Sequence, residues 1–136
     1  MEVRVRHGKD KQSEAFARFH RVVCDQTFDE GGSDSGMTPP EFLLVSLGTC
    51  AGFYAAQYLK ARSLPAGGLA VKVTADKSAE GPARLEHFHI EVTAPELAPQ
   101  HQAGVLRAVK ACLIHNTLVH QPEIDIVLQT PVCAPA

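Results

Sequence analysis

A long helix begins within the stretch TPPEFLLVSLGTC, residues 38–50. Thr38, Pro39 and Glu41 match the capping-box pattern, with Thr38 as the N-cap, proline at the first helical position and Glu41 at the third. No charged residue occurs from Phe42 to Leu59. This length approaches that of a membrane span, but its small and polar residues favour a central helix buried by protein on most of its sides.

Segments on both sides of this helix alternate apolar and polar residues, as half-buried strands do. Strands are expected at residues 3–6, 15–23, 69–75, 88–92 and 124–128, with an irregularity near Leu85 where the alternation breaks. A second helix is expected to begin at Pro99 and to carry an apolar stripe that includes Val105, Cys112 and Leu113. The element order ββ(β)-α-ββ-α-β predicts an α+β fold of mostly antiparallel sheets.

The composition is that of one ordinary soluble domain covering residues 1–136. The chain is 45% hydrophobic and 21% charged, with a net charge of −2. No basic excess points to a nucleic acid or an anionic membrane as partner. The N-terminal sequence MEVRVR has no apolar segment, so no secretory signal is expected. Four irregularly spaced cysteines do not resemble a disulfide scaffold, which favours the reducing cytoplasm as location.

Two of these cysteines, Cys50 and Cys112, lie on the apolar stripes of the two predicted helices, 62 residues apart. If the helices pack together, the sulfurs could form a redox-active pair, which requires Cα atoms about 4.4–6.8 Å apart. The alternative is that both are inert, because free cysteine often acts as a small buried hydrophobe. Cys24 and Cys133 are expected to be incidental.

Peroxide chemistry would require Cys50 to be a thiolate. Cys50 lies about three turns into its helix, where the helix dipole has faded. An arginine held by a carboxylate is therefore needed to activate it. Glu41 is the candidate carboxylate, and the candidate arginines are Arg6, Arg18 and Arg21.

Several motifs together resemble the OsmC/Ohr family, and most closely its OsmC-like branch. They are the glycines at 31, 32 and 36, the sequence PEFLL at 40–44, LGTC at 47–50 and CLIHNTL at 112–118. The resemblance implies an intertwined homodimer with long central helices between two sheets and active sites at the subunit interface. It also implies cysteine-based reduction of organic hydroperoxides without a cofactor. The disulfide would be reduced by a dihydrolipoamide-type dithiol or another cellular thiol.

Carried over by motif, Cys50 becomes the peroxidatic thiol, Cys112 the resolving thiol and Glu41 the family's carboxylate. The glycine-rich context of the family's activating arginine is missing here. A small-ligand or lipid-binding dimer without catalysis, or a redox sensor, therefore stays open as an alternative. His115 could polarise Cys112 or donate a proton, although capping of the helix end is favoured. His87 and His89 are interpreted as part of a solvated strand face, and no metal site is expected.

Overall fold

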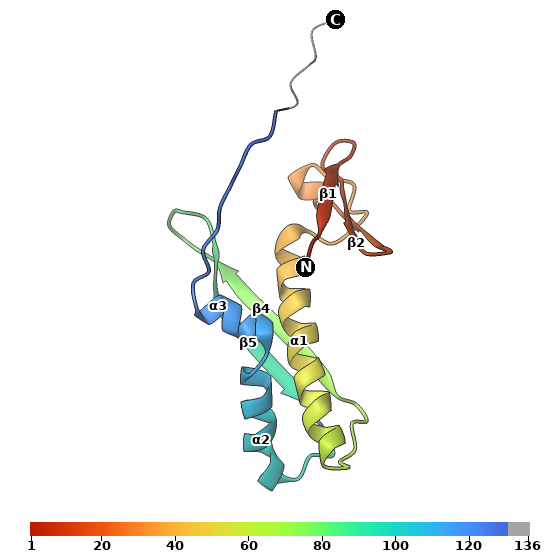
Figure 1. The fold of residues 1–136 in the computed structure, drawn as a ribbon, viewed down its shortest axis with the longest axis vertical. Helices are drawn as coiled ribbons and strands as arrows, with labels where there is room; N and C mark the ends of the chain where they lie inside the picture. The colour runs from red at the N-terminus through yellow and green to blue at the C-terminus, as the bar shows by residue number, and fades with distance from the viewer. Residues whose placement is uncertain (131–136) are drawn as a thin grey trace, which may run out of the picture.

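The computed structural model describes residues 1–130 as an α+β fold built on one long helix (Figure 1). The three-stranded sheet contains β1 (Arg4–His7), β2 (Ser13–Ala17) and β3 (His20–Cys24), and the two-stranded sheet contains β4 (Ala70–Lys77) and β5 (Leu85–Thr93). The helical elements are η1 (Phe28–Glu30), α1 (Pro39–Ala61), α2 (Pro99–Lys110) and α3 (Leu113–Val119). The predicted fold class is confirmed, with both sheets antiparallel.

The predicted capping box defines the start of α1. Glu41 Oε2 accepts hydrogen bonds from the Thr38 backbone N at 2.7 Å and from Thr38 Oγ1 at 3.0 Å. Proline at the first helical position adds no unsatisfied N–H group. The helix therefore begins where the sequence predicts and continues two residues beyond Leu59.

The hydrophobic core lies where α1 meets α2 and the two-stranded sheet. Ala51, Ala55 and Leu59 on α1 are fully buried and pack with Val105 and Val109 of α2. The small alanine side chains let α2 come close to α1, and the larger side chains fill the space on either side. Figure 1 shows α2 running beside the C-terminal half of α1, with β4 and β5 packed against the same region.

The N-terminal sheet stands beyond the start of α1 rather than on the core (Figure 1). The single strand predicted at 15–23 is wrong, because two strands, β2 and β3, occupy this segment. Arg18 adopts a left-handed conformation with φ of 54°, which allows a tight turn in which Ala17 pairs with His20. The turn contains no glycine or proline to mark it, so the sequence pattern did not reveal it.

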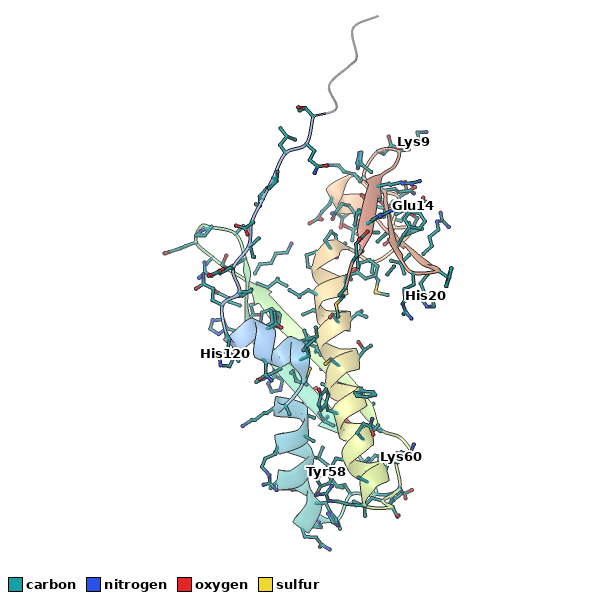
Figure 2. The ribbon with its side chains drawn as sticks, viewed as in Figure 1. Lys9, Glu14, His20, Tyr58, Lys60 and His120 are labelled. Atoms are coloured by element: carbon teal, nitrogen blue, oxygen red, sulfur yellow. The ribbon has the colours of Figure 1, made fainter. Side chains whose placement is uncertain are left out.

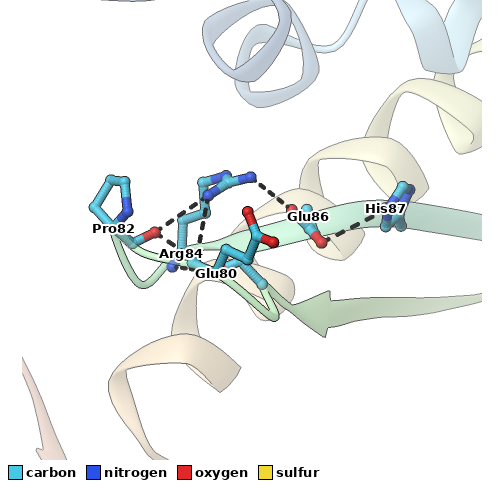
Figure 3. Close-up of polar contacts among 6 residues, drawn as sticks. Glu80, Pro82, Arg84, Glu86 and His87 are labelled. Carbon is cyan, nitrogen blue, oxygen red and sulfur yellow. Dashed lines mark hydrogen bonds and ion pairs between the residues drawn. The ribbon is translucent and has the colours of Figure 1, made fainter.

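The β4–β5 hairpin confirms the two strands predicted there and the irregularity near Leu85. The register shifts opposite Thr74 and Asp76, where β5 contains one extra residue, and His87 in this bulge has φ of 54°. At the hairpin tip, Arg84 donates to the Pro82 carbonyl at 3.2 Å and pairs with Glu86 at 2.9 Å (Figure 3). These contacts secure the turn on the solvent side.

The strand predicted at 124–128 does not form within this chain, so that prediction is wrong for the single chain. Residues 121–130 have no regular structure, and Ile126 is 93% exposed. Alternation favours a strand only where a sheet edge is available for pairing. Figure 1 shows this segment running away from both sheets, so it has no such edge.

Candidate functional site: a cysteine pair

Cys50 and Cys112 lie together in the folded chain, as the packing of two apolar stripes predicts. The Cys50 thiol lies close enough to Cys112 to raise the pKa of the Cys112 thiol. Cys50 lies half-buried in the middle of α1, whereas Cys112 is 0% exposed. Both are free thiols. The fold therefore supplies two reduced sulfurs in contact, only one of which solvent can reach.

Cys112 is not inside a helix, which corrects the prediction of one continuous helix from Pro99 through Leu113. Helix α2 ends at Lys110, and Cys112 is the N-cap of the short helix α3, with φ of −57° and ψ of 132°. The backbone N of Ala111 already shares its hydrogen bond between two carbonyls, a sign that α2 is ending. The apolar spacing runs unbroken across this junction, so the pattern could not locate it.

The surroundings of Cys112 act on its thiol in opposite directions. Burial raises the pKa of Cys112, and the hydrogen bond with Cys50 raises it further. Backbone N–H groups of Ile114 and His115 point at the sulfur and lower the pKa, the His115 N–H at a distance of 3.5 Å from Sγ. The net pKa is raised, so Cys112 is held as the neutral thiol near neutral pH.

Glu41 is occupied by the helix cap and does not touch Cys50 of the same chain. Hydrogen bonds from the Thr38 backbone N–H and hydroxyl lower the pKa of Glu41, so it carries a negative charge. Its Oε1 atom makes no hydrogen bond within residues 1–130. Nine residues separate Glu41 from Cys50, about 13.5 Å along the helix axis at about 1.5 Å per residue.

The three candidate arginines lie in the N-terminal sheet, away from the cysteine pair. Arg21 forms an ion pair with Glu14, which Figure 2 labels in that sheet. The Arg6 guanidinium lies 5.6 Å from the centre of the Phe16 ring, and Arg18 occupies the β2–β3 turn. Within residues 1–130, none of the ion pairs or hydrogen bonds of these arginines involves Cys50.

An apolar cavity of about 560 Å³ lies between α1, β5, α2 and α3, and its lining includes His115, whose backbone N–H contacts Cys112 Sγ. Leu43 and Leu47 of α1 line it, whereas Phe53 and Leu113 do not and are each 59% exposed. The cavity lining consists of Leu43, Leu47, Leu85, Phe88, Ile90, Leu106, Val109, Lys110, His115, Leu118 and Val119.

The side chain of His115 faces this cavity and does not cap a helix, so the favoured capping role is wrong for the side chain. Only its backbone N–H contributes, by donating to Cys112 Sγ at 3.5 Å. Its Nδ1 atom is buried and has no hydrogen-bond partner within the described part of the chain. Such an atom is unusual, because buried polar groups are normally paired.

The remaining cysteines and histidines take no part in this pair. Cys24 is the last residue of β3, where burial and the charge of Asp25 raise its pKa, and Cys133 lies outside the described residues. His87 and His89 are exposed on β5 near Glu86 and Glu91. Within residues 1–130, no group of three possible ligands could hold a metal ion.

Sequence reasoning missed Asp25, which organises the loop before α1. It is 1% exposed and accepts hydrogen bonds from the backbone N–H groups of Gln26, Ser33 and Ser35 and from the Ser35 hydroxyl. The signal that could have found it is an aspartate at a strand end followed by a serine-rich and glycine-rich loop. Asp25 thereby fixes the loop that leads into the capping box.

Comparison with known proteins assigns the fold to a family. A family model described as OsmC-like protein matches residues 32–127. The chain therefore belongs to the OsmC-like protein family, as the motifs predict. No curated protein sequence matches the chain. By length and composition α1 could also cross a membrane, but it is here the central helix of the OsmC-like fold.

Solved structures show the same fold at low sequence identity. An osmotic stress induced and detoxification response protein from Psychrobacter arcticus aligns with a TM-score of 0.76 and 20% identity over 85% of each chain. An OsmC-like protein from Mycoplasma pneumoniae aligns with a TM-score of 0.73 and 21% identity, over 88% of this chain and 87% of that one. An organic hydroperoxide resistance protein OsmC from Legionella pneumophila gives 0.62 and 10% identity, over 86% and 87%.

Proposed function

We propose that the protein reduces organic hydroperoxides with its cysteine thiols. The observation that carries the proposal is the contact between the Cys50 and Cys112 thiols together with their unequal exposure. An outside oxidant can reach the half-buried Cys50, while the buried Cys112 is placed to react with whatever forms on Cys50. Membership of the OsmC-like family supports peroxide-related redox chemistry.

The reaction proceeds in two steps that need no cofactor. The Cys50 thiolate attacks the distal oxygen of the hydroperoxide, the O–O bond breaks, and the departing alkoxide takes a proton from solvent and leaves as the alcohol. Cys50 is then a sulfenic acid. The Cys112 sulfur attacks the Cys50 sulfur, the S–O bond breaks, and water leaves as the disulfide forms. A dithiol of the dihydrolipoamide type, or another thiol of a reducing cytoplasm, returns the pair to its starting state.

A second copy of the chain would cover the exposed apolar side chains and supply an arginine and a carboxylate at Cys50. Helix α1 leaves Val45 and Phe53 exposed although it is almost wholly apolar. The N-terminal sheet also exposes Val5 and Val22, and residues 124–128 expose further apolar side chains. Large exposed apolar surfaces of this kind mark interaction sites. A homodimer would cover them and could bring an arginine and Glu41 from one copy to Cys50 of the other.

The second candidate function is a dimer that binds a small apolar ligand without catalysis. The cavity of about 560 Å³ favours it, as does the lack of any arginine contact with Cys50 within residues 1–130. Titration of the Cys50 thiol distinguishes the two functions. A thiolate at neutral pH supports the enzyme, and a thiol that ionises only at alkaline pH supports the binder.

The decisive experiment is intact mass after brief treatment with one equivalent of cumene hydroperoxide. The wild-type chain should lose two hydrogen atoms, Cys112→Ser should retain one oxygen as a trappable sulfenic acid, and Cys50→Ser should not react. An unmodified wild-type chain would reject the peroxidase. Faster consumption of hydrogen peroxide than of cumene hydroperoxide would reject the preference for organic substrates.

A further inference from the structure

We propose that the imidazole of His115 accepts the proton of the Cys112 thiol when the disulfide forms, passes it to the departing hydroxide, and donates a proton to the Cys112 sulfur when the disulfide is reduced. This inference rests on the proposed function, because it assigns a role within the resolving step. It makes His115, whose backbone N–H contacts Cys112 Sγ at 3.5 Å, a third reacting group of the site.

The first argument is position. The backbone N–H of His115 contacts Cys112 Sγ at 3.5 Å, so the imidazole is attached to a residue that already touches the reacting sulfur. In the reduced chain Nδ1 has no hydrogen-bond partner among residues 1–130. The proposal requires a change of side-chain rotamer or a bridging water to connect Nδ1 to Sγ, and catalytic contacts often tighten only during the reaction.

The second argument is the cost of the arrangement. Leaving a buried nitrogen without a partner costs free energy, and the structure offers no compensating contact. In a capping box, the side chain of the third helical residue accepts a hydrogen bond from the backbone N–H of the N-cap residue. His115 Nδ1 does not do this, because the Cys112 N–H already donates to the Val109 carbonyl at 3.0 Å. Because His115 Nδ1 has no hydrogen-bond partner within residues 1–130, it is free to accept the Cys112 proton for a short time during the reaction.

The third argument is chemical need. Formation of the disulfide makes one S–S bond and breaks one S–O bond, and the proton of Cys112 must end on the departing hydroxide to give water. Cys112 is 0% exposed, so bulk water cannot take this proton directly. Its thiol is also held neutral by its surroundings. A base inside the protein is therefore required for a fast reaction.

The fourth argument is the lack of competitors. Four elements line the cavity that His115 faces, and α1 and β5 contribute only apolar side chains to it. Helix α2 contributes Lys110, whose ammonium group has no free acceptor. Among the residues that line this cavity, His115 is thus the one whose side chain can accept a proton.

The test compares His115→Asn with His120→Asn, a matched control at the exposed end of α3 (Figure 2). The chain has no tryptophan, so sulfenic acid and disulfide are followed by rapid acid quench and mass spectrometry after addition of cumene hydroperoxide. His115→Asn should form the sulfenic acid at the wild-type rate but form the disulfide about 100-fold more slowly. The rate–pH profile of disulfide formation should lose a break that the wild type and His120→Asn retain.

A second arm does not depend on peroxide chemistry. The disulfide is formed with diamide, and the rate of its reduction by dithiothreitol is measured. Dithiothreitol attacks the accessible Cys50 sulfur, and the Cys112 sulfur that is released takes up a proton. His115→Asn and His115→Gln should both slow this step and change its pH profile. Wild-type rates and profiles in both variants would overturn the proposal, as would slowing with an unchanged profile, which indicates a structural role. If the wild type forms no sulfenic acid with cumene hydroperoxide, the proposed peroxidase activity is rejected. The reduction of the diamide-formed disulfide then remains the test of the role of His115.

Discussion

Cys112 contacts Cys50 from a fully buried position, although the two residues belong to different helical segments and are 62 residues apart in the sequence. The unequal exposure predicts unequal reactivity. In the reduced protein, iodoacetamide should modify Cys50 at least about tenfold faster than Cys112, because alkylation needs both access and a thiolate. Peptide-resolved mass spectrometry after timed quenching measures both rates. Equal rates at the two sites would contradict the geometry described above.

Oxidation of the pair should stabilise the fold. A disulfide from Cys50 to Cys112 closes a long loop and restricts the unfolded chain, which is worth up to about 4 kcal/mol if the bond forms without strain. Thermal unfolding of the diamide-treated protein should therefore shift upward by roughly 10 °C. Cys112→Ser provides the control, since it should show no shift after the same treatment. A lower unfolding temperature for the oxidised wild type would mean that the bond distorts the native packing.

The contact between α1 and α2 depends on Gly104. A Cβ atom at this position would lie 2.1 Å from the Tyr58 hydroxyl oxygen, which approaches His101 Nδ1 at 3.3 Å. Gly104→Ala should therefore displace Tyr58 and cost about 1–3 kcal/mol of unfolding free energy. Gly67→Ala is the matched control, because a Cβ there would meet nothing within 4 Å. Denaturant unfolding of both variants measures the difference, and equal stability would mean that the helices are less closely packed.

Asp25 makes the stability of the loop before α1 dependent on pH. Hydrogen bonds, led by that from the Ser35 hydroxyl, lower the pKa of Asp25 to about 2, below the usual value of about 3.9. The charged form is favoured in the folded state, so its contribution is complete above the usual pKa and is lost as the pH falls toward about 2. Asp25→Asn should melt roughly 5 °C lower at pH 7, with a smaller difference in acid. The exposed Asp29→Asn should melt as the wild type does at both pH values.

Local signals predicted the parts of the fold that depend on one stretch of sequence. The capping box at Thr38 located the start of α1 because both hydrogen bonds are made within four residues. Period-two alternation found β4 and β5. The break between α2 and α3 was not predictable, because the apolar spacing on either side of Cys112 stays in phase. The turn at Arg18 was also not predicted, because it contains no glycine or proline to mark it.

The site was predictable to a similar degree. Two apolar stripes that each carry a cysteine were enough to expect Cys50 and Cys112 to meet, because apolar stripes pack together. The side chain of His115 was not predictable, because its surroundings depend on how α3 turns away from α2. Glu41 and the arginines were chosen as a clamp for Cys50, but helix geometry keeps them apart within one chain. The proposed dimer assigns their roles to a second copy, which a single sequence does not describe.

Phe53 tests the proposed second copy most directly. It is 59% exposed on the apolar helix α1, and burying an aromatic side chain at an interface often contributes 2 kcal/mol or more, so Phe53→Lys should weaken dimerisation about 30-fold or more. Phe28→Lys is the control, because Phe28 is also exposed but belongs to η1. Sedimentation velocity over a concentration series measures both variants.

If the second copy also activates Cys50, Phe53→Lys should lose sulfenic acid formation with cumene hydroperoxide yet still form the disulfide with diamide. A wild-type chain that sediments as a monomer at all concentrations would reject the homodimer.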